Sequence, residues 1–164
     1  LINIIIKIGE IMNIDFVNEK YRFNARSSAI IYNTDKTKVL LFNVGDDRDF
    51  YMLPGGRIMH FENSKDAIKR KIKEELGWLL EYDFCCIQEN FLESKGKKIT
   101  QYNFCYKAIY DGKISNEPIN CHDNAYQSFK WVSLKELDNY KILPKSNKDL
   151  ILENINLFHI IERT

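Results

Sequence analysis

The chain has 164 residues, of which 45% are hydrophobic and 29% are charged. This length suits one domain with a sizeable core and is too short for two comfortable ones. The 24 basic and 23 acidic side chains give a formal net charge of +1. This near-zero net charge does not favour a nucleic acid polymer or an acidic membrane as a partner. Any recognition of phosphate must therefore be local.

The N-terminal segment is predicted to lie outside the folded domain. We expect residues 1–20 to form an extension and residues 21–164 to form the domain. The apolar stretch from Leu1 to Ile8 is far too short to span a bilayer and lacks the long hydrophobic region of a signal peptide. A further hypothesis is that translation begins at Met12, because the codons for residues 9–11 can encode a purine-rich ribosome-binding site.

The cysteines show no signature of a zinc site or a disulfide framework, since the sequence has no CxxC pair and no histidine at zinc-site spacing. We therefore predict free thiols in a cytoplasmic protein at Cys85, Cys86, Cys105 and Cys121. Cys121 is followed by His122 and Asp123. Adjacent side chains in a loop rarely meet at one point, so a nucleophile or ligand cluster is not expected there.

The first part of the chain has the pattern of strands separated by turns. Strands are predicted at 22–32, 38–44 and 50–53, with turn-forming residues at 33–36 and 45–48. One face of the first strand is formed by alternating residues: Phe23, Ala25, Ser27, Ala29 and Ile31. The run Pro54-Gly55-Gly56 is predicted to end regular structure ahead of a helix.

That helix is predicted to begin near Asn63 or Ser64 and to end at Gly77. Asn63 and Ser64 are both good N-cap residues, and Asp66 suits the positive end of the helix dipole. Gly77 is well placed to end the helix in a left-handed conformation.

The second part of the chain predicts more strands and two helices. Aromatic and β-branched residues favour strands at 78–91, 99–110 and 129–132, the first two joined by a turn at 94–97. Ser133-Leu134-Lys135-Glu136 fits a capping box at the start of a short helix. A last helix is predicted over Asn147–Ile161, where helical spacing relates Leu150, Ile151, Ile155 and Phe158. This mixture predicts an α/β sandwich with a mixed sheet.

The run from Gly56 to Trp78 contains the most informative motif. Glu62 follows Gly56 after five residues, and Arg70 follows Glu62 after seven. The motif continues with Ile72, Glu74, Glu75, Gly77 and Trp78. This spacing resembles the Nudix box, and the flanking runs 51–57 and 129–137 are also similar to Nudix hydrolases.

The resemblance implies a Nudix-type α/β/α sandwich and a Mg²⁺- or Mn²⁺-dependent enzyme. Such an enzyme cleaves a pyrophosphate bond in a nucleoside diphosphate joined to another group. By resemblance, Glu74, Glu75 and Glu62 are the catalytic residues, and the metal ligands are Glu74, Glu75 and the Gly56 carbonyl. Glu62 can alternatively brace the loop. Arg70 and Gly77 are expected to support the box structurally.

Helical geometry agrees with this assignment. At about 100° per residue, Ile68, Ile72 and Leu76 form a core stripe, while Lys71, Glu74 and Glu75 fall on an adjoining arc. Carboxylates on a rigid helix can hold hard cations that neutralise phosphate oxygens and polarise water. The alternative interpretation of Glu74 and Glu75 is a solvated helix face with Lys71 as an ion-pair partner.

Three residues depart from the family pattern. Lys71 stands where the family places the Glu of its Arg-Glu pair, and an ammonium there replaces a ligand with a competing charge. Phe61 stands where relatives usually have a small residue, so a positive φ at this position would be strained. Gln101 lies on a strand where many relatives carry Glu.

The remaining predictions concern ligands and partners. Arg26 and Arg57 are candidates for phosphate contacts, and the alternative is that they are ordinary surface charges. Tyr51 or Phe61 is a candidate for stacking on a base. Trp131 is expected to pack in the core. We predict a small nucleotide-type substrate and no nucleic acid or membrane partner; a homodimer is an assembly common in the family. The rival hypothesis is a Nudix-fold nucleotide-binding or sensor module that has lost catalysis.

Overall fold

The computed structural model describes residues 12–45, 49–153 and 158–163. Within these ranges all strands belong to one sheet: β1 (Asp15–Val17), β2 (Tyr21–Asn33), β3 (Lys38–Asn43), β4 (Gly55–Arg57), β5 (Asp83–Ser94), β6 (Lys97–Tyr110), β7 (Ile119–Asn120), β8 (Ser128–Ser133) and β9 (His159–Arg163). The helices are α1 (Ser64–Leu76), the 3-10 helix η1 (Leu134–Asn139) and α2 (Ser146–Ile151). None of the helices in the described ranges is long and apolar enough to cross a membrane.

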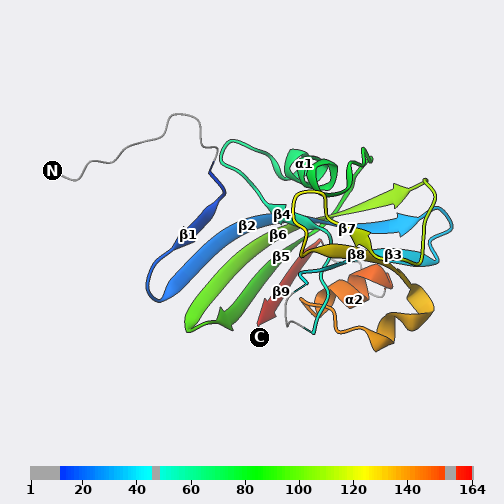
Figure 1. Ribbon diagram of the computed structural model, residues 1–164. Coiled ribbons are helices and arrows are strands. Elements are labelled where there is room, and N and C mark those ends of the chain that lie inside the picture. The colour runs from blue at the N-terminus through cyan, green and yellow to red at the C-terminus, as the bar shows by residue number, and fades with distance from the viewer. Residues whose placement is uncertain (1–11, 46–48, 154–157, 164) are drawn as a thin grey trace.

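The central strand of the sheet is β2. One of its edges pairs in parallel with β6 along its whole length, from Tyr21 opposite Lys98 to Asn33 opposite Tyr110. Its other edge pairs in turn with β1, β4 and β3. The main strand order is β7-β8-β3-β2-β6-β5-β9 (Figure 1). The predicted mixed sheet is therefore confirmed.

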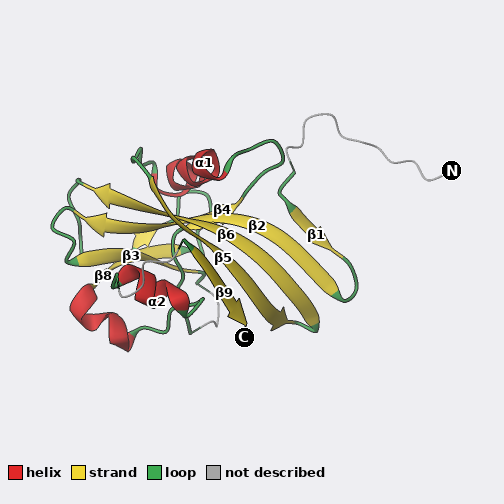
Figure 2. Cartoon of the chain, turned by 180° about the vertical axis from the view of Figure 1, so that it is seen from behind, coloured by secondary structure: helices red, strands yellow, loops and turns green. Residues whose placement is uncertain are grey.

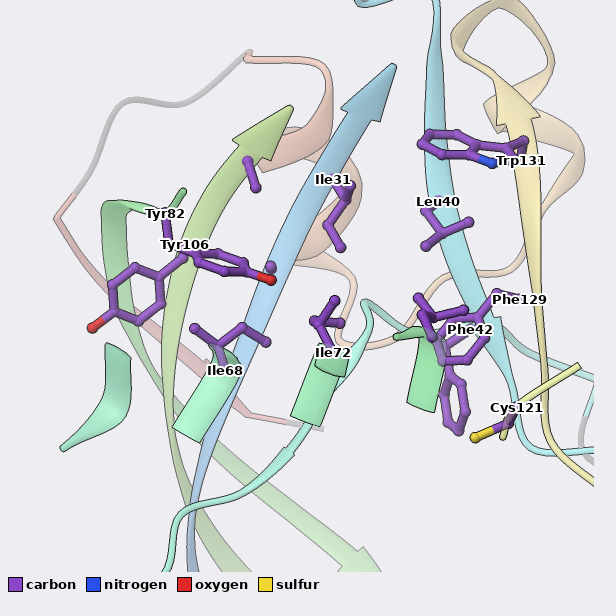
Figure 3. Packing of buried hydrophobic residues seen from close by; sticks show 13 residues of the cluster. Ile31, Leu40, Phe42, Ile68, Ile72, Tyr82, Tyr106, Cys121, Phe129 and Trp131 are labelled. Carbon is purple, nitrogen blue, oxygen red and sulfur yellow. The ribbon is translucent and has the colours of Figure 1, made fainter. Parts of the chain in front are cut away.

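The two α-helices lie on opposite sides of the sheet, as both views show (Figures 1 and 2). The predicted core stripe of α1 is buried, with Ile68 and Ile72 inaccessible to solvent, and it packs in one cluster with Ile31 of β2 (Figure 3). A second cluster contains Leu150 and Ile151 of α2. These two apolar layers hold the helices against the sheet, and the predicted α/β/α sandwich is confirmed.

Helix α1 has the ends that its sequence predicts. The Asn63 side chain accepts a hydrogen bond of 2.9 Å from the backbone N–H of Asp66, which caps the first turn. Gly77 has φ of 73° and its N–H donates to the carbonyl of Lys73. A residue with a Cβ is disfavoured in this left-handed conformation, which is why glycine ends the helix here.

Three strand predictions need correction. Residues 50–53 do not form a strand, and Tyr51 and Met52 make isolated bridges to Ile142 and Phe42 instead. Gly55 and Gly56 do not end regular structure, because they belong to β4 and pair with Ser28 and Ser27 of β2. The strand predicted from Trp78 begins only at Asp83. The Trp78 ring stacks on Tyr110 with 3.9 Å between ring centroids, so this aromatic residue packs on the sheet from a loop.

The predicted helix Asn147–Ile161 is also wrong in its second half. Helix α2 ends at Ile151, and His159–Arg163 forms β9, which pairs in parallel with β5. Burial alternates along β9, so tertiary pairing with the edge of β5 outweighs the helical spacing of the apolar residues. Ile155 lies outside the described residues.

The N-terminal boundary stays a prediction. Residues 1–11, which include most of the predicted extension, lie outside the described residues. Asp15–Val17 of that extension form β1 and pair with Arg22–Asn24 of β2. The described end of the predicted extension therefore contributes a strand to the sheet.

Candidate active site

The C-terminal half of α1 presents two carboxylates to one cation, the Lys71 ammonium. Lys71 Nζ lies 3.0 Å from Glu75 Oε1 and 3.2 Å from Glu74 Oε2. The three residues occupy neighbouring turns of the helix, as the helical spacing predicts. Lys71 therefore lies between the carboxylates rather than pointing away from them.

A third carboxylate, Asp123, reaches the same ammonium from a loop. Lys71 Nζ lies 3.4 Å from Asp123 Oδ2. The loop is fixed to the helix because the His122 backbone N–H donates to the Glu75 carbonyl at 2.9 Å. Cys121 approaches as well, and its thiol donates to Asp123 Oδ1 at 2.9 Å. The expectation that neighbouring side chains of this loop would not converge is wrong for Cys121 and Asp123.

Burial and charge act in opposite directions on the pKa values in this cluster. Burial pulls the pKa of Lys71 down, but the attraction of Glu75 and the smaller effects of Glu74 and Asp123 outweigh it and raise the pKa overall. Burial raises the pKa of Glu75 in spite of Lys71. Glu75 Oε2 is buried, and no described residue donates a hydrogen bond to it. The carboxylates therefore carry more acceptor capacity than the ammonium satisfies.

Gly56 provides the space that the lysine stem occupies. A Cβ built on Gly56 would lie 2.8 Å from Cε and 2.9 Å from Cδ of Lys71. Real Cβ atoms do not approach so closely, so the absence of a side chain at this position lets the stem pass. The Lys71 side chain is only 18% exposed, which shows that it is packed into the site.

Glu62 and Arg70 hold the loop before α1. Arg70 donates from Nε to Glu62 Oε1 at 2.7 Å and from Nη2 to Oε2 at 2.9 Å. Glu62 Oε2 also accepts from the Met59 backbone N–H at 2.9 Å. The fork geometry gives a strong, directional pair. Three hydrogen bonds thus hold Glu62 as a brace of the loop, and its part in catalysis and metal binding stays a prediction.

The carboxylates face a cleft of about 490 Å³ that is also lined by cationic side chains and by Gly55 and Gly56. Its lining includes Arg26 of β2 and Gly56 and Arg57 of β4. Burial lowers the pKa of Arg26, and the neighbouring Arg57 adds to this effect. Arg57 Nε also pairs with Asp15 Oδ2 at 2.8 Å. Acidic and basic groups therefore meet in one opening, an arrangement that suits a phosphate ligand together with a cation.

Comparison with known proteins identifies this arrangement. The family model of the NUDIX domain matches residues 22–153, which include the glycines of β4, the whole of α1 and the loop with Asp123. The chain belongs to the Nudix family.

Solved structures show the same Nudix fold. The chain is similar to the dihydroneopterin triphosphate pyrophosphohydrolase of E. coli, with a TM-score of 0.65 and 18% identity over 82% of this chain and 97% of that one. It is also similar to a MutT protein from Bacillus halodurans, with a TM-score of 0.63 and 16% identity over 85% and 89% of the two chains. The NUDIX domain of Shewanella oneidensis NrtR, complexed with ADP ribose, gives a TM-score of 0.61 and 17% identity over 84% and 90%.

One curated relative matches a shorter segment. The Pre-mRNA cleavage factor Im 25 kDa subunit 2 of Arabidopsis thaliana is 32% identical over 66 residues. The match covers 40% of this chain and 32% of that protein. This chain therefore aligns with about a third of the length of that relative.

A second cleft adjoins the first one, and three amide side chains are part of its lining: Asn24, Asn90 and Gln101. It measures about 480 Å³, and Arg26 and Met52 line both clefts. Gln101 Nε2 donates to Asn24 Oδ1 at 2.9 Å, and Asn90 Nδ2 donates to Gln101 Oε1 at 3.3 Å. Gln101 therefore belongs to this amide row rather than to the carboxylate cluster. Asn90 Oδ1 is buried, and no hydrogen-bond donor reaches it from the described chain.

The aromatic residues predicted to stack on a base lie outside both clefts. Tyr51 packs against Tyr140, with 5.2 Å between ring centroids. Phe61 has φ of 63° and a fully exposed side chain, so the positive φ that its position predicts is present. Trp131 is 3% exposed and stacks near Trp78 and Tyr110, which confirms its place in the core.

Sequence reasoning missed two parts of this site. The first is Asp123, whose place beside α1 depends on a backbone hydrogen bond between distant segments. The second is the pair Asn24 and Asn90, which come together only through strand register: each is opposite Gln101 across the sheet. Alternation along the predicted strands was the one available signal, because it could have placed these amides on a common face.

Proposed function

We propose that this chain is a Nudix-type hydrolase that cleaves a pyrophosphate bond in a nucleoside diphosphate derivative. The observation that carries the proposal is the convergence of Glu74, Glu75 and Asp123 on one cation position. Arg26 and Arg57 line the same cleft. The guanidinium groups would bind phosphate oxygens while the carboxylates organise the positive charge that faces them.

The adjoining cleft supports a nucleoside as the rest of the substrate. Because Arg26 lines both clefts, a ligand can place its phosphates beside the Nudix box and its base beside the amides. The amide side chains of Asn24, Asn90 and Gln101 line this cleft and offer donors and acceptors to a base. The complex of the Shewanella oneidensis relative with ADP ribose supports a nucleotide-derived ligand.

Nudix hydrolases generally use divalent metal ions, and the donor set suits Mg²⁺ or Mn²⁺. Glu74, Glu75 and the Gly56 carbonyl are the proposed ligands, with Asp123 as a further oxygen donor. Glu75 Oε2 is buried without a hydrogen-bond partner among the described residues, which supports a cation in this place. When bound, the metal would neutralise phosphate oxygens and polarise the attacking water. Lys71 must leave the carboxylates for the metal to bind.

The same lysine favours a second candidate function, a nucleotide-binding or sensor module without catalysis. Its ammonium already pairs with Glu74, Glu75 and Asp123. A fixed positive charge at that position can attract a phosphate without polarising a water as a metal ion does. The lysine therefore supports binding of a phosphate group without supporting catalytic turnover.

The test is turnover on a panel of nucleoside triphosphates, nucleotide sugars, ADP-ribose and dinucleotide polyphosphates with Mg²⁺ or Mn²⁺. Phosphate and nucleotide release are measured for the wild type, for Glu74→Gln and for Glu117→Gln. Glu117 is exposed and lines neither cleft, so its variant controls for loss of one acidic charge.

Metal-dependent turnover that Glu74→Gln abolishes and Glu117→Gln retains would support the hydrolase. If no compound is cleaved but one of them raises the melting temperature of the protein, the binding module replaces the hydrolase as the proposed function. A protein that neither cleaves nor binds any member of the panel would contradict both functions. Cytoplasmic localisation and a homodimer stay predictions, and fractionation and analytical ultracentrifugation test them.

A further inference from the structure

Three cysteine thiols converge on the opposite side of the sheet from the Nudix box helix. Cys85 and Cys86 lie on β5 and Cys105 lies on β6, and their sulfur atoms are all within 4.8 Å of one another. Cys86 and Cys105 are fully buried, while Cys85 is partly exposed. They pack in the apolar cluster that contains Leu150 and Ile151 of α2. The three free thiols thus form one compact group.

A β-bulge explains how neighbouring residues reach the same point. In a regular strand the side chains of Cys85 and Cys86 would point to opposite faces. Here Phe84 pairs with Tyr106 and Cys86 with Cys105, so Cys85 is an extra residue that has no partner in β6. A bulge of this kind redirects side chains, and it brings both thiols of β5 towards Cys105. The geometry of the backbone therefore assembles the group.

The spacing of the sulfurs suits a shared metal ion. Sulfurs bound to one ion at about 2.3 Å lie roughly 3.8–4.0 Å apart, so a modest side-chain movement from the observed spacing is sufficient. In the described part of the chain, no histidine or carboxylate joins the group. The partial exposure of Cys85 leaves a route for water as a further ligand.

We propose that Cys85, Cys86 and Cys105 form a three-thiolate site for a thiophilic metal ion with a filled d shell, Zn²⁺ or Cu⁺. Thiolate is the preferred ligand of these ions, whereas Mg²⁺ and Mn²⁺ prefer oxygen. On binding, each coordinating thiol releases its proton to solvent and forms one metal–sulfur bond, with no change in oxidation state. This site is separate from the proposed Nudix chemistry and does not depend on it.

The surroundings can offset the negative charge that three thiolates bring. Lys107 follows Cys105 by two residues on β6, and its Nζ pairs with Glu153 Oε1 at 2.9 Å. A cation therefore lies close to the group, on the strand that carries Cys105.

The test measures metal binding to the reduced, metal-free full chain under anaerobic conditions. Zn²⁺ alone and Cu⁺ alone are titrated in separate experiments against a competing chelator, with thiolate-to-metal absorption as a second readout. The variants are Cys85→Ser and Cys105→Ser. Cys121→Ser tests the rival location, because Cys121 is also a buried free thiol but lies beside Glu75 and Asp123, a second group that could hold a metal ion. Circular dichroism and thermal melting of each metal-free variant establish that it folds.

We expect one equivalent of Zn²⁺ or Cu⁺ per chain. Cys85→Ser should weaken binding by more than the roughly 10- to 100-fold that loss of an outer-shell partner costs, and Cys121→Ser should leave it unchanged. Because Cys85 is partly exposed, this result stands even if Cys105→Ser does not fold. The proposal is wrong if neither ion binds at one equivalent, if folded Cys85→Ser binds as the wild type does, or if Cys121→Ser removes binding.

Discussion

Lys71 is the residue on which the chemistry of the site depends most. Its ammonium contacts the carboxylates of Glu74, Glu75 and Asp123, and its stem lies against Gly56. Removing one member of a buried charge cluster leaves the others uncompensated. The effect of a change at this position therefore depends on whether another cation can take its place.

We predict that Lys71→Glu binds Mn²⁺ at least about tenfold more tightly than the wild type, because the change removes a competing charge and adds an oxygen ligand. Turnover on any cleaved member of the panel should increase as well. Calorimetric Mn²⁺ titration measures the affinity. Lys73→Glu is the matched control, since Lys73 is exposed on the same helix. No gain, or an equal gain in the control, would contradict the missing-ligand explanation.

Glu62 leads to a prediction about pH. Its hydrogen bonds with Arg70 lower its pKa from the ordinary value of 4.5, against the opposing effect of burial. A carboxyl whose pKa is lower in the folded state stabilises the fold above its unfolded pKa. That contribution is lost as the pH falls below 4.5 and through the lowered pKa.

We therefore expect Glu62→Gln to lose about 2 kcal/mol of stability near pH 7, where charge-assisted hydrogen bonds are lost. The wild type and the variant should approach each other in stability as the pH falls below 4.5. Urea denaturation along a pH series measures this, with Glu117→Gln as the control for a lost surface charge. A stability difference that does not depend on pH would show that the charge of Glu62 is not the cause.

At the scale of elements, buried amides connect the sheet to α2. Gln88 of β5 is inaccessible to solvent. Its Nε2 donates to Asn147 Oδ1 at 2.9 Å and to Ser146 Oγ at 3.0 Å, and its Oε1 accepts from Asn103 Nδ2 at 2.6 Å. One side chain thus links β5, β6 and the first turn of α2.

We predict that Gln88→Leu lowers the free energy of unfolding by about 2–3 kcal/mol, because it leaves the groups around it without partners. Leucine is of similar size, so a cavity contributes little. Denaturant melts measure the change. A loss below about 0.5 kcal/mol, typical of surface substitutions, would show that water replaces the amide.

Elements with local signals could be predicted from the sequence, and elements that depend on pairing could not. Helix α1 was predictable because Asn63 and Gly77 mark its ends and Ile68 and Ile72 mark its buried face. Strand β9 was not, since its conformation depends on the edge of β5. The bulge at Cys85 has the same origin, because strand register is a tertiary property.

The candidate site divides in the same way. Glu74 and Glu75 follow from helical spacing within one segment. Asp123 and the amide row require contacts between segments that are distant in the chain. The sequence left open whether Lys71 pairs with Glu74 and Glu75. The packing of its stem against Gly56 shows where the ammonium lies.

At the scale of the molecule, β2 is paired on both edges. Its partner β6 accompanies it for the full length, while β1, β4 and β3 share the other edge. Strands at the centre of a sheet open only with the whole domain, whereas peripheral strands open locally.

We therefore predict that the backbone amides of Ser27–Ile31 are among the slowest to exchange with deuterium in the described chain. Those of β9, which among the described strands pairs with β5 alone, should exchange at least about tenfold faster. Hydrogen exchange followed by mass spectrometry of overlapping peptides measures both. Equal protection of β9 would mean that the sheet opens as one unit.

The central place of β2 also limits how the length of the chain can vary during evolution. Even-numbered positions of this strand carry Asn24 and Arg26, which line the amide cleft, while Ala25 and Ala29 pack towards α1. A deletion of one residue within β2 would exchange these two faces, and would therefore destroy the core and the clefts together. In related sequences, insertions and deletions should therefore be confined to loops. The residues of β2 that line the clefts should change only by substitution.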